Sequence, residues 1–210
     1  MNLREVFAEK DEAEVKAFIA SICFATFVSS GNDREPVASH LPIDFIPSKG
    51  RYGTLISHVA NSNAHVQFLT PDRPLLVIIA SSSAYVSPSW FSDRSRAPTQ
   101  AHRVVHCYGR PRRITDREEV RAIMEQQVRS REHGRQGSWN IDELGDAGYQ
   151  RRLGAISGIE MTIERVLCSF RLLQDESEPR NVLGAIDALE RGDNRHLAQA
   201  VFSANSERLE

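Results

Sequence analysis

The chain has 210 residues, 40% of them hydrophobic, and its 26 Lys and Arg residues nearly balance 28 Asp and Glu residues, giving a formal net charge of −2. This length and apolar content suffice for one domain with a buried core. A net charge near zero gives no general attraction to nucleic acid or to an anionic membrane. The longest unbroken apolar run, Leu75–Ala80, has six residues and is too short to cross a bilayer. Transmembrane, fibrous and disordered classes are thereby excluded.

The cysteines and the N-terminal residues bear on the cellular compartment. Cys23, Cys107 and Cys168 are odd in number, widely spaced and set in apolar segments. This pattern is typical of reduced core thiols and not of a disulfide framework or a zinc site. The first residues lack the apolar stretch of a signal peptide. The sequence therefore predicts a cytoplasmic protein that does not bind membranes.

The arginines are unevenly distributed along the chain. Eleven of the 23 lie between Arg94 and Arg135, where five acidic residues leave a net of six positive charges. Such a stretch can be an anion site or a nucleic-acid surface, or it can be an ordinary solvated surface in an arginine-rich composition. Nucleic acid is therefore a possible partner, although the net charge of the chain does not support it.

Hydrophobic periodicity and turn residues predict the elements in chain order. A helix follows Asp11 and continues to Ile22, because apolar residues recur there at helical spacing. Strands are expected over 23–29, 36–45 and 52–58, a single helical turn over 64–69, a buried strand over 74–80, a segment 82–86 that continues this strand or hairpins back, a loop over 92–99 and a long strand over 102–114.

The pattern changes after residue 114. Thr115 and Glu118 can form a capping box for a helix over 115–133, and the polar, glycine-rich stretch 134–148 is expected to be a loop. A β-rich segment follows, and then two helices. These later elements are predicted over 153–173, from Pro179 to Gly192, and over 195–204.

These elements predict a mainly β fold with flanking helices. About six or seven strands precede residue 115 and one follows, and their connections are too short for crossover helices. Short connections favour an antiparallel barrel over a parallel sheet. No Rossmann or P-loop glycine pattern occurs.

The segment Ile56–Asn63 is the strongest local candidate for a binding site. A strand is expected to end there and a short helix to begin, among small polar residues. Free backbone N–H groups at such a point can hold a phosphate, and His58 can supply another donor. The alternative is that Asn61 or Ser62 only caps the helix.

No other pattern predicts a metal site or a catalytic nucleophile. His102 and His106 share one strand face about 13 Å apart at ~3.3 Å per residue, too far to bind one ion. His40, on an earlier strand, is expected to be a hydrogen-bonded wall residue. The sequence contains no Gly-x-Ser-x-Gly elbow and no HExxH or CxxC motif.

Five segments in order resemble the PaiB family. They are Ala38–Pro42, His58–Asn63, Ala84–Phe91 with its Tyr-Val-Ser-Pro-Ser-Trp string, Ala97–Thr99 and Val105–Gly109. The resemblance extends over nearly the whole chain, including the late strand that ends at Gln174 and the C-terminal helix from Arg180.

The resemblance implies an FMN-binding split β-barrel of the pyridoxamine-phosphate-oxidase-like kind, in a homodimer with FMN at the subunit interface. It implies a split-barrel domain over 1–175, with 115–133 as an inserted helix, and a C-terminal helical extension over 176–210. The strand 39–42 would run along the flavin ring and the segment around His58 would surround the phosphate. The cofactor-binding residues so implied are Ser39, His40, Leu41, Pro42, Ser57, His58, Ala60, Asn63 and Gln174.

The chain also departs from the family pattern. Gln100-Ala101-His102 stands where family members usually carry Trp-Asn-Tyr, and Ala64 stands where a proline is usual. Less stacking surface and fewer donors predict weak FMN binding or another flat phosphorylated ligand.

Two classes of function follow from the resemblance. The first is an FMN-binding negative regulator of transcription. The alternatives are a flavin-dependent oxidoreductase of the same fold, which needs no catalytic protein nucleophile, or a haem-handling relative. The sequence alone does not decide whether the protein is an enzyme.

Overall fold

The computed structural model describes residues 5–8 and 11–209. Seven strands form its framework: β1 (Phe24–Ser30), β2 (Pro36–Ile46), β3 (Thr54–Ala60), β4 (Leu75–Ala80), β5 (Ala84–Val86), β6 (Thr99–Ile114) and β7 (Ile156–Arg171). The α-helices are α1 (Glu12–Ala20), α2 (Arg117–Glu132), α3 (Gly145–Gly154), α4 (Pro179–Arg191), α5 (Arg195–Ser203) and α6 (Ser206–Leu209). Short 3₁₀ helices are η1 (Glu5–Phe7), η2 (Asn32–Arg34), η3 (Ala64–Phe68), η4 (Pro88–Trp90) and η5 (Ile141–Leu144).

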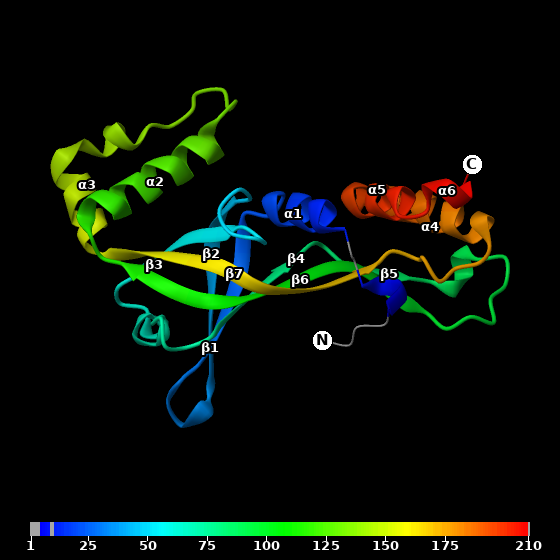
Figure 1. The fold of residues 1–210 in the computed structure, drawn as a ribbon. Coiled ribbons are helices and arrows are strands. Elements are labelled where there is room, and N and C mark those ends of the chain that lie inside the picture. The colour runs from blue at the N-terminus through cyan, green and yellow to red at the C-terminus, as the bar shows by residue number, and fades with distance from the viewer. Residues whose placement is uncertain (1–4, 9–10, 210) are drawn as a thin grey trace. The chain divides into compact units, whose positions relative to one another are not determined.

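The strands form one sheet in the order β4-β1-β2-β3-β7-β6-β5, and β4 also pairs with β6 (Figure 1). This additional pairing closes six of the strands into a ring and leaves β5 outside it. The pairs with a defined register are antiparallel, as the short connections predict. In the register, His40 of β2 lies opposite Thr26 of β1, and Ser57 of β3 lies opposite Ile43 of β2.

The alternation of side chains along the strands builds the core. In β1, Ala25 and Phe27 are buried while Phe24 on the opposite face is 56% exposed. Residues of the other strands follow the same period, because successive side chains of a strand point to opposite faces. The largest fully buried side chains of these strands are Phe27, Ile43, Leu55, Leu75, Ile79, Ile159, Met161 and Ile163.

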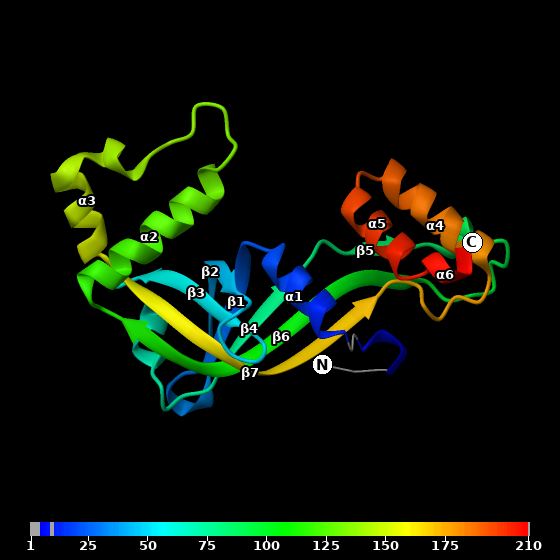
Figure 2. The same ribbon diagram turned by 45° about the horizontal axis from the view of Figure 1, so that its top comes forward.

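The chain divides into two compact units, each with its own contacts. One contains residues 16–79 and 106–166, with β1 to β3, most of β4, and the helices α2 and α3. The other contains the described residues up to 15, with 80–105 and 167–209. Figure 2 shows its helices α4, α5 and α6 gathered at the C-terminal end of the chain, where α4 contacts both α5 and α6. The expected boundary at residue 175 stays a prediction.

The structure corrects two of the predicted elements. The stretch 134–148 is not simply a loop, because η5 begins at Ile141 and α3 begins at Gly145 and continues to Gly154. The expected β-rich segment from 153 accordingly starts as strand only at Ile156. Leu153 of α3 is buried with Ile114 and Val120, so an apolar cluster stabilises a helix that its glycines disfavour.

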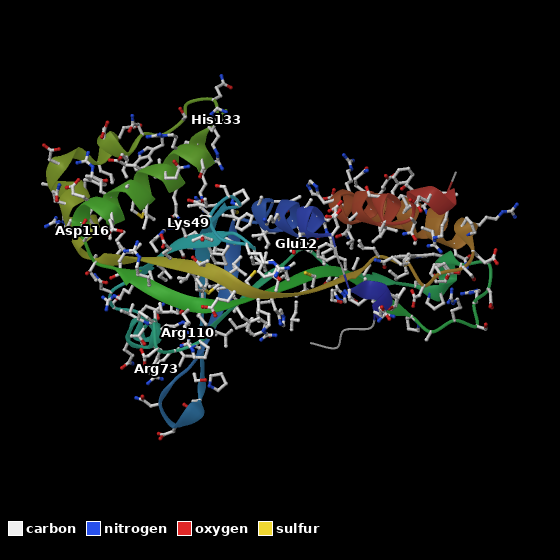
Figure 3. The ribbon with its side chains drawn as sticks, viewed as in Figure 1. Glu12, Lys49, Arg73, Arg110, Asp116 and His133 are labelled. Carbon is white, nitrogen blue, oxygen red and sulfur yellow. The ribbon has the colours of Figure 1, made fainter. Side chains whose placement is uncertain are left out.

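The cap of α2 also differs from the expectation. Asp116, and not Thr115, is its N-cap: the Asp116 carboxylate accepts hydrogen bonds from the Glu118 and Glu119 backbone N–H groups, at 3.1 and 3.0 Å. Figure 3 labels Asp116 at this first end of α2 and His133 at the other. Within the described ranges, no helix combines the length and the apolar content needed to span a membrane.

Candidate functional site

The segment around His58 has the local structure that its sequence predicts. β3 ends at Ala60, the Asn63 N–H donates to the Ala60 carbonyl at 2.9 Å to close a turn, and η3 begins at Ala64. The cap of η3 is Asn63, whose side chain accepts from the His65 N–H at 2.9 Å, and not Asn61 or Ser62. The predicted change from strand to helix is therefore confirmed, with the cap displaced by one or two residues.

A buried hydrogen-bond network holds this turn against the sheet. The two ring nitrogens of His65, which is fully buried, contact Ser29 Oγ at 2.7 Å and Ser39 Oγ at 3.1 Å. Asn63 Nδ2 donates to Ser39 Oγ at 3.0 Å. Two of the residues implied by the resemblance, Ser39 and Asn63, are thus brought together. Sequence reasoning missed His65, although a histidine one residue past a predicted helix start was a visible signal.

The position of His65 fixes its charge. Burial lowers the pKa of the imidazole, since no described carboxylate compensates a positive charge there. A neutral imidazole has one donor and one acceptor nitrogen, which suits two hydroxyl partners. The network therefore consists of neutral groups.

His58 lies on the outward face of β3 and contacts α2. Its Nδ1 is 2.7 Å from Oε1 of Gln127, a buried side chain of α2. Burial is the main cause that lowers the pKa of His58, with a smaller contribution from the charge of Arg131. Arg131 donates to Asp44 Oδ1 and to the Ile43 carbonyl, both at 3.0 Å. No local pattern in the sequence indicates that the helix over 115–133 covers His58.

The other residues implied on β2 and β3 divide between the two sheet faces. Leu41 and Ser57 point inward and are 8% and 1% exposed, and Ser57 Oγ donates to the Pro42 carbonyl at 2.6 Å. His40 points outward, where its Nδ1 is 2.9 Å from Thr26 Oγ1. Leu41 and Ser57 point into the core, so their side chains cannot touch a ligand on the outer face and only their backbone groups can. The side chain of His40 can contact such a ligand directly.

Phe24 adds an aromatic surface beside His40. The two rings are stacked, with centroids 6.4 Å apart and an interplanar angle of 27°. Phe24 is exposed, whereas Phe27, the other aromatic residue of β1, is buried. Phe24 was not among the residues implied by the resemblance. Its place opposite Pro42 follows from the strand register, which no residue near Phe24 in the sequence signals.

Gln174 belongs to the other compact unit, and its role toward a ligand stays a prediction. Its side chain folds back locally: Nε2 donates to the Phe170 carbonyl at 2.6 Å, and Oε1 accepts from the Leu172 N–H at 2.7 Å. Both polar ends of Gln174 are therefore engaged with its own segment.

An arginine that the sequence did not single out lies at the start of the turn. Arg113 Nε donates to Ser157 Oγ at 3.0 Å, and one terminal nitrogen donates to Asn61 Oδ1 at 3.2 Å. Ser157 Oγ in turn donates to Asn61 Oδ1 at 2.6 Å, and Asn61 Nδ2 donates to the Gly154 carbonyl at 3.2 Å. Asn61 is thus fixed by groups from β6, β7 and α3.

The groups that remain free at this turn fit a phosphate. In the described part of the chain, no acceptor takes the backbone N–H of Ser62 or of Ala64, and the Ser62 hydroxyl has no partner. Ser62 and Ala64 are exposed. Unpaired N–H and O–H donors at a turn can bind the oxygens of an anion or of an uncharged group. The free groups of this turn are therefore candidates for holding a flavin phosphate.

The described residues of the remaining candidates include no metal centre, and part of the positive charge of the arginine-rich stretch is paired. Across residues 5–8 and 11–209, no three His, Cys, Asp or Glu side chains are grouped to hold a metal ion. The arginine-rich stretch is partly neutralised, because Arg112, Arg121 and Arg131 form ion pairs with Glu119, Glu125 and Asp44.

The comparison with protein families decides what kind of chain this is. Residues 1–165 match the family described as "Putative FMN-binding domain". The chain belongs to this family. FMN is therefore the ligand to consider at the turn 60–64 and its free donors.

Two curated proteins are similar to this FMN-binding domain protein. "Protease synthase and sporulation protein PAI 2" of Bacillus subtilis is 24% identical over 199 residues, which cover 95% of this chain and 94% of the relative. "Uncharacterized protein YKL070W" of Saccharomyces cerevisiae is 35% identical over 96 residues, covering 42% of this chain and 57% of the relative. The full-length match to PAI 2 confirms the resemblance to PaiB stated from the motifs.

Solved structures share the fold at low identity. The flavocytochrome Anf3 from Azotobacter vinelandii has a TM-score of 0.60 and 16% identity, over 81% of this chain and 72% of its own. The conserved hypothetical protein Rv2991 from Mycobacterium tuberculosis has a TM-score of 0.57 and 13% identity, over 81% and 91%. The FAD and heme binding protein from Mycobacterium smegmatis has a TM-score of 0.55 and 14% identity, over 78% and 73%. These likenesses concern the fold alone, and they confirm the expected split barrel with flanking helices.

Proposed function

We propose that the protein binds FMN, with the flavin phosphate held at the turn 60–64. The observation that carries this proposal is the donor set of that turn in a chain of the FMN-binding domain family. The Ser39–Asn63–His65 network supports it, because it fixes the backbone donors before any ligand arrives. Donors that are already oriented bind an anion without a further ordering cost.

The flavin ring would lie along β2, where the resemblance implies it. The exposed stack of His40 on Phe24 offers a flat aromatic surface beside Pro42. Offset stacking of aromatic rings contributes about 0.5–1.5 kcal/mol beyond the area buried. FMN bound in this way would supply hydride or electron transfer, and the chain would contribute binding and orientation.

We further propose that the protein acts as a cytoplasmic homodimer. Phe24 is 56% exposed, and the outward side chains Val28, Leu76 and Ile78 of the neighbouring strands are only half-buried. A second protomer covering this face would bury these apolar groups together with one side of the flavin. Sedimentation at micromolar concentration should give twice the 23.6 kDa chain mass, and a monomer would contradict the shared site.

A role in negative regulation of transcription rests on the likeness to the PaiB family and is proposed at that level. Arg131 pairs with Asp44 and Arg112 with Glu160, two carboxylates outside the arginine-rich stretch, and these pairs leave less free positive charge for DNA than the sequence suggests. Direct binding would appear as a salt-dependent mobility shift of duplex DNA that weakens when Arg129 and Arg135 are neutralised. Absence of a shift at low salt would show that any regulation is indirect.

Fluorescence titration with FMN tests the binding site. The double variant His58→Ala, Asn63→Ala removes two side chains that hold the turn, the His58 ring bound to Gln127 and the Asn63 amide that donates to Ser39, so we expect its Kd to rise about tenfold or more. Arg94→Ala, in an exposed loop, is the control and should bind as the wild type does. A double variant with wild-type affinity would place the phosphate elsewhere.

A further inference from the structure

Arg113 differs from the arginines around it in how its charge is compensated. Its neighbour Arg112 contacts the carboxylates of Glu119 at 2.9 Å and Glu160 at 3.6 Å, and Lys49 also pairs with Glu160 at 2.8 Å. Arg113 contacts two neutral oxygens, those of Ser157 and Asn61. Among the described carboxylates, none pairs with it. Its positive charge is therefore fixed in place and not neutralised.

The orientation of this guanidinium is set by buried and cross-linked partners. Ser157 is 1% exposed, and its hydroxyl bridges Arg113 and Asn61. Asn61 is held on its other side by its backbone N–H donating to the Ala155 carbonyl at 2.8 Å and by its side-chain amide. Because Nε and one terminal nitrogen of Arg113 are used, the other terminal nitrogen is left to a ligand. A guanidinium presented in one orientation is suited to the oxygens of a phosphate.

The contact with Asn61 places this charge next to the proposed phosphate position. Asn61 directly precedes Ser62, whose N–H and hydroxyl are free. The backbone donors of the turn are neutral and would bind a phosphate or any other acceptor. The charge of Arg113 adds what they lack, a preference for an anion over an uncharged group.

We infer that Arg113 is the residue by which this site selects phosphorylated flavin over riboflavin. This inference rests on the proposed function, since it assigns a residue to the phosphate end of the proposed FMN site. FMN carries a phosphate of about −1.5 to −2 charge near neutral pH, whereas riboflavin ends in a hydroxyl. Arg113 acts on that difference and not on the flavin ring.

Titration of the full chain with FMN and with riboflavin tests this. Arg113→Gln keeps a side chain that can donate to Asn61 but removes the charge, and we expect its Kd for FMN to rise roughly tenfold or more while its Kd for riboflavin changes less than twofold. Arg113→Lys restores the charge without the fork and should recover part of the preference. Arg112→Gln, an exposed neighbour that pairs with Glu119, is the matched control and should keep the wild-type ratio of the two affinities.

The outcomes separate the two proposals. FMN binding that Arg113→Gln leaves within twofold of wild type would overturn the role of Arg113 alone. An equal loss of FMN and riboflavin affinity would also overturn it, because it would mean that Arg113 only positions Asn61. A wild-type protein that binds neither flavin would overturn the proposed function, and this inference with it. Circular dichroism of each variant confirms that the affinities refer to folded protein.

Discussion

The hydrogen bond between Ser29 and His65 gives the sharpest test of the network behind the turn. Ser29 Oγ and His65 Nε2 are 2.7 Å apart, and the two side chains are 5% and 0% exposed. We consider Ser29→Ala, His65→Leu and the double variant. Each single change leaves one buried polar group without its partner, whereas the double change removes both.

The expected magnitudes follow from this difference. Ser29→Ala leaves His65 Nε2 unpaired in the core, which costs about 1–3 kcal/mol of unfolding free energy. His65→Leu leaves the Ser29 hydroxyl unpaired and also loses the bond to Ser39, for roughly 2–4 kcal/mol, although Ser39 keeps its bond to Asn63. In the double variant the unpaired group is absent, so its destabilisation should be smaller than the sum of the two by about 1–2 kcal/mol.

Urea unfolding at pH 7.5, followed by far-ultraviolet circular dichroism, measures these free energies. At that pH His65 is neutral, because its pKa lies below the ordinary value of about 6.5. Ser30→Ala, the exposed neighbour of Ser29, is the control and should change the free energy by less than about 0.5 kcal/mol. Strictly additive single changes, or a Ser29→Ala variant as stable as wild type, would refute the argument that these groups pair in a dry core.

Three further outcomes are expected. Acidification below about pH 6.5 should lower the free energy of unfolding, because the unfolded chain then binds protons at histidines that burial keeps neutral in the fold. The stabilising contribution of these histidines is complete only above that pH, and each contributes at most about 1.4 kcal/mol per pH unit. Urea midpoints that do not fall between pH 7.5 and pH 5 would contradict this. The histidines concerned are His58, His65 and His106. Gly109→Ala should cost about 1–3 kcal/mol in thermal unfolding, since its Cβ would overlap the Thr162 carbonyl oxygen, whereas Gly154→Ala meets no atom within 4 Å and should be tolerated. Asp116→Ala should cost about 1 kcal/mol and increase hydrogen exchange in the first turn of α2, and unchanged exchange would argue against the cap.

The strand framework could be predicted from the sequence because its signals are local. Alternating burial along β1 and β4 and the turn at Asn63 follow from residues close in the chain. The helix α3 could not be predicted, because its glycines disfavour a helix and its stability depends on Leu153 packing against α2 and the end of β6. Tertiary packing there outweighs local propensity.

The same distinction applies to the candidate site. The motif around His58 indicated the segment, and Ser39 and Asn63 do lie together. Two of the residues missed, Gln127 and Arg113, are 69 and 52 positions from their partners His58 and Asn61. Nothing local to either residue signals such a contact. Long-range pairing across the sheet had to be known before these side chains could be assigned to the site.

The interleaving of the two compact units along the chain has a consequence for synthesis. The unit with α4 and α5 draws on residues 80–105 and 167–209, so its middle segment leaves the ribosome long before its last helices do. During that interval η4 lacks α4, which it contacts in the finished protein, and Ser92 lacks the Asn181 side chain that accepts from its N–H. Such a nascent chain is a natural client for a chaperone that covers apolar surface. A premature stop after β7 would make this loss of partners permanent, and we expect the truncated product to be removed by proteolysis.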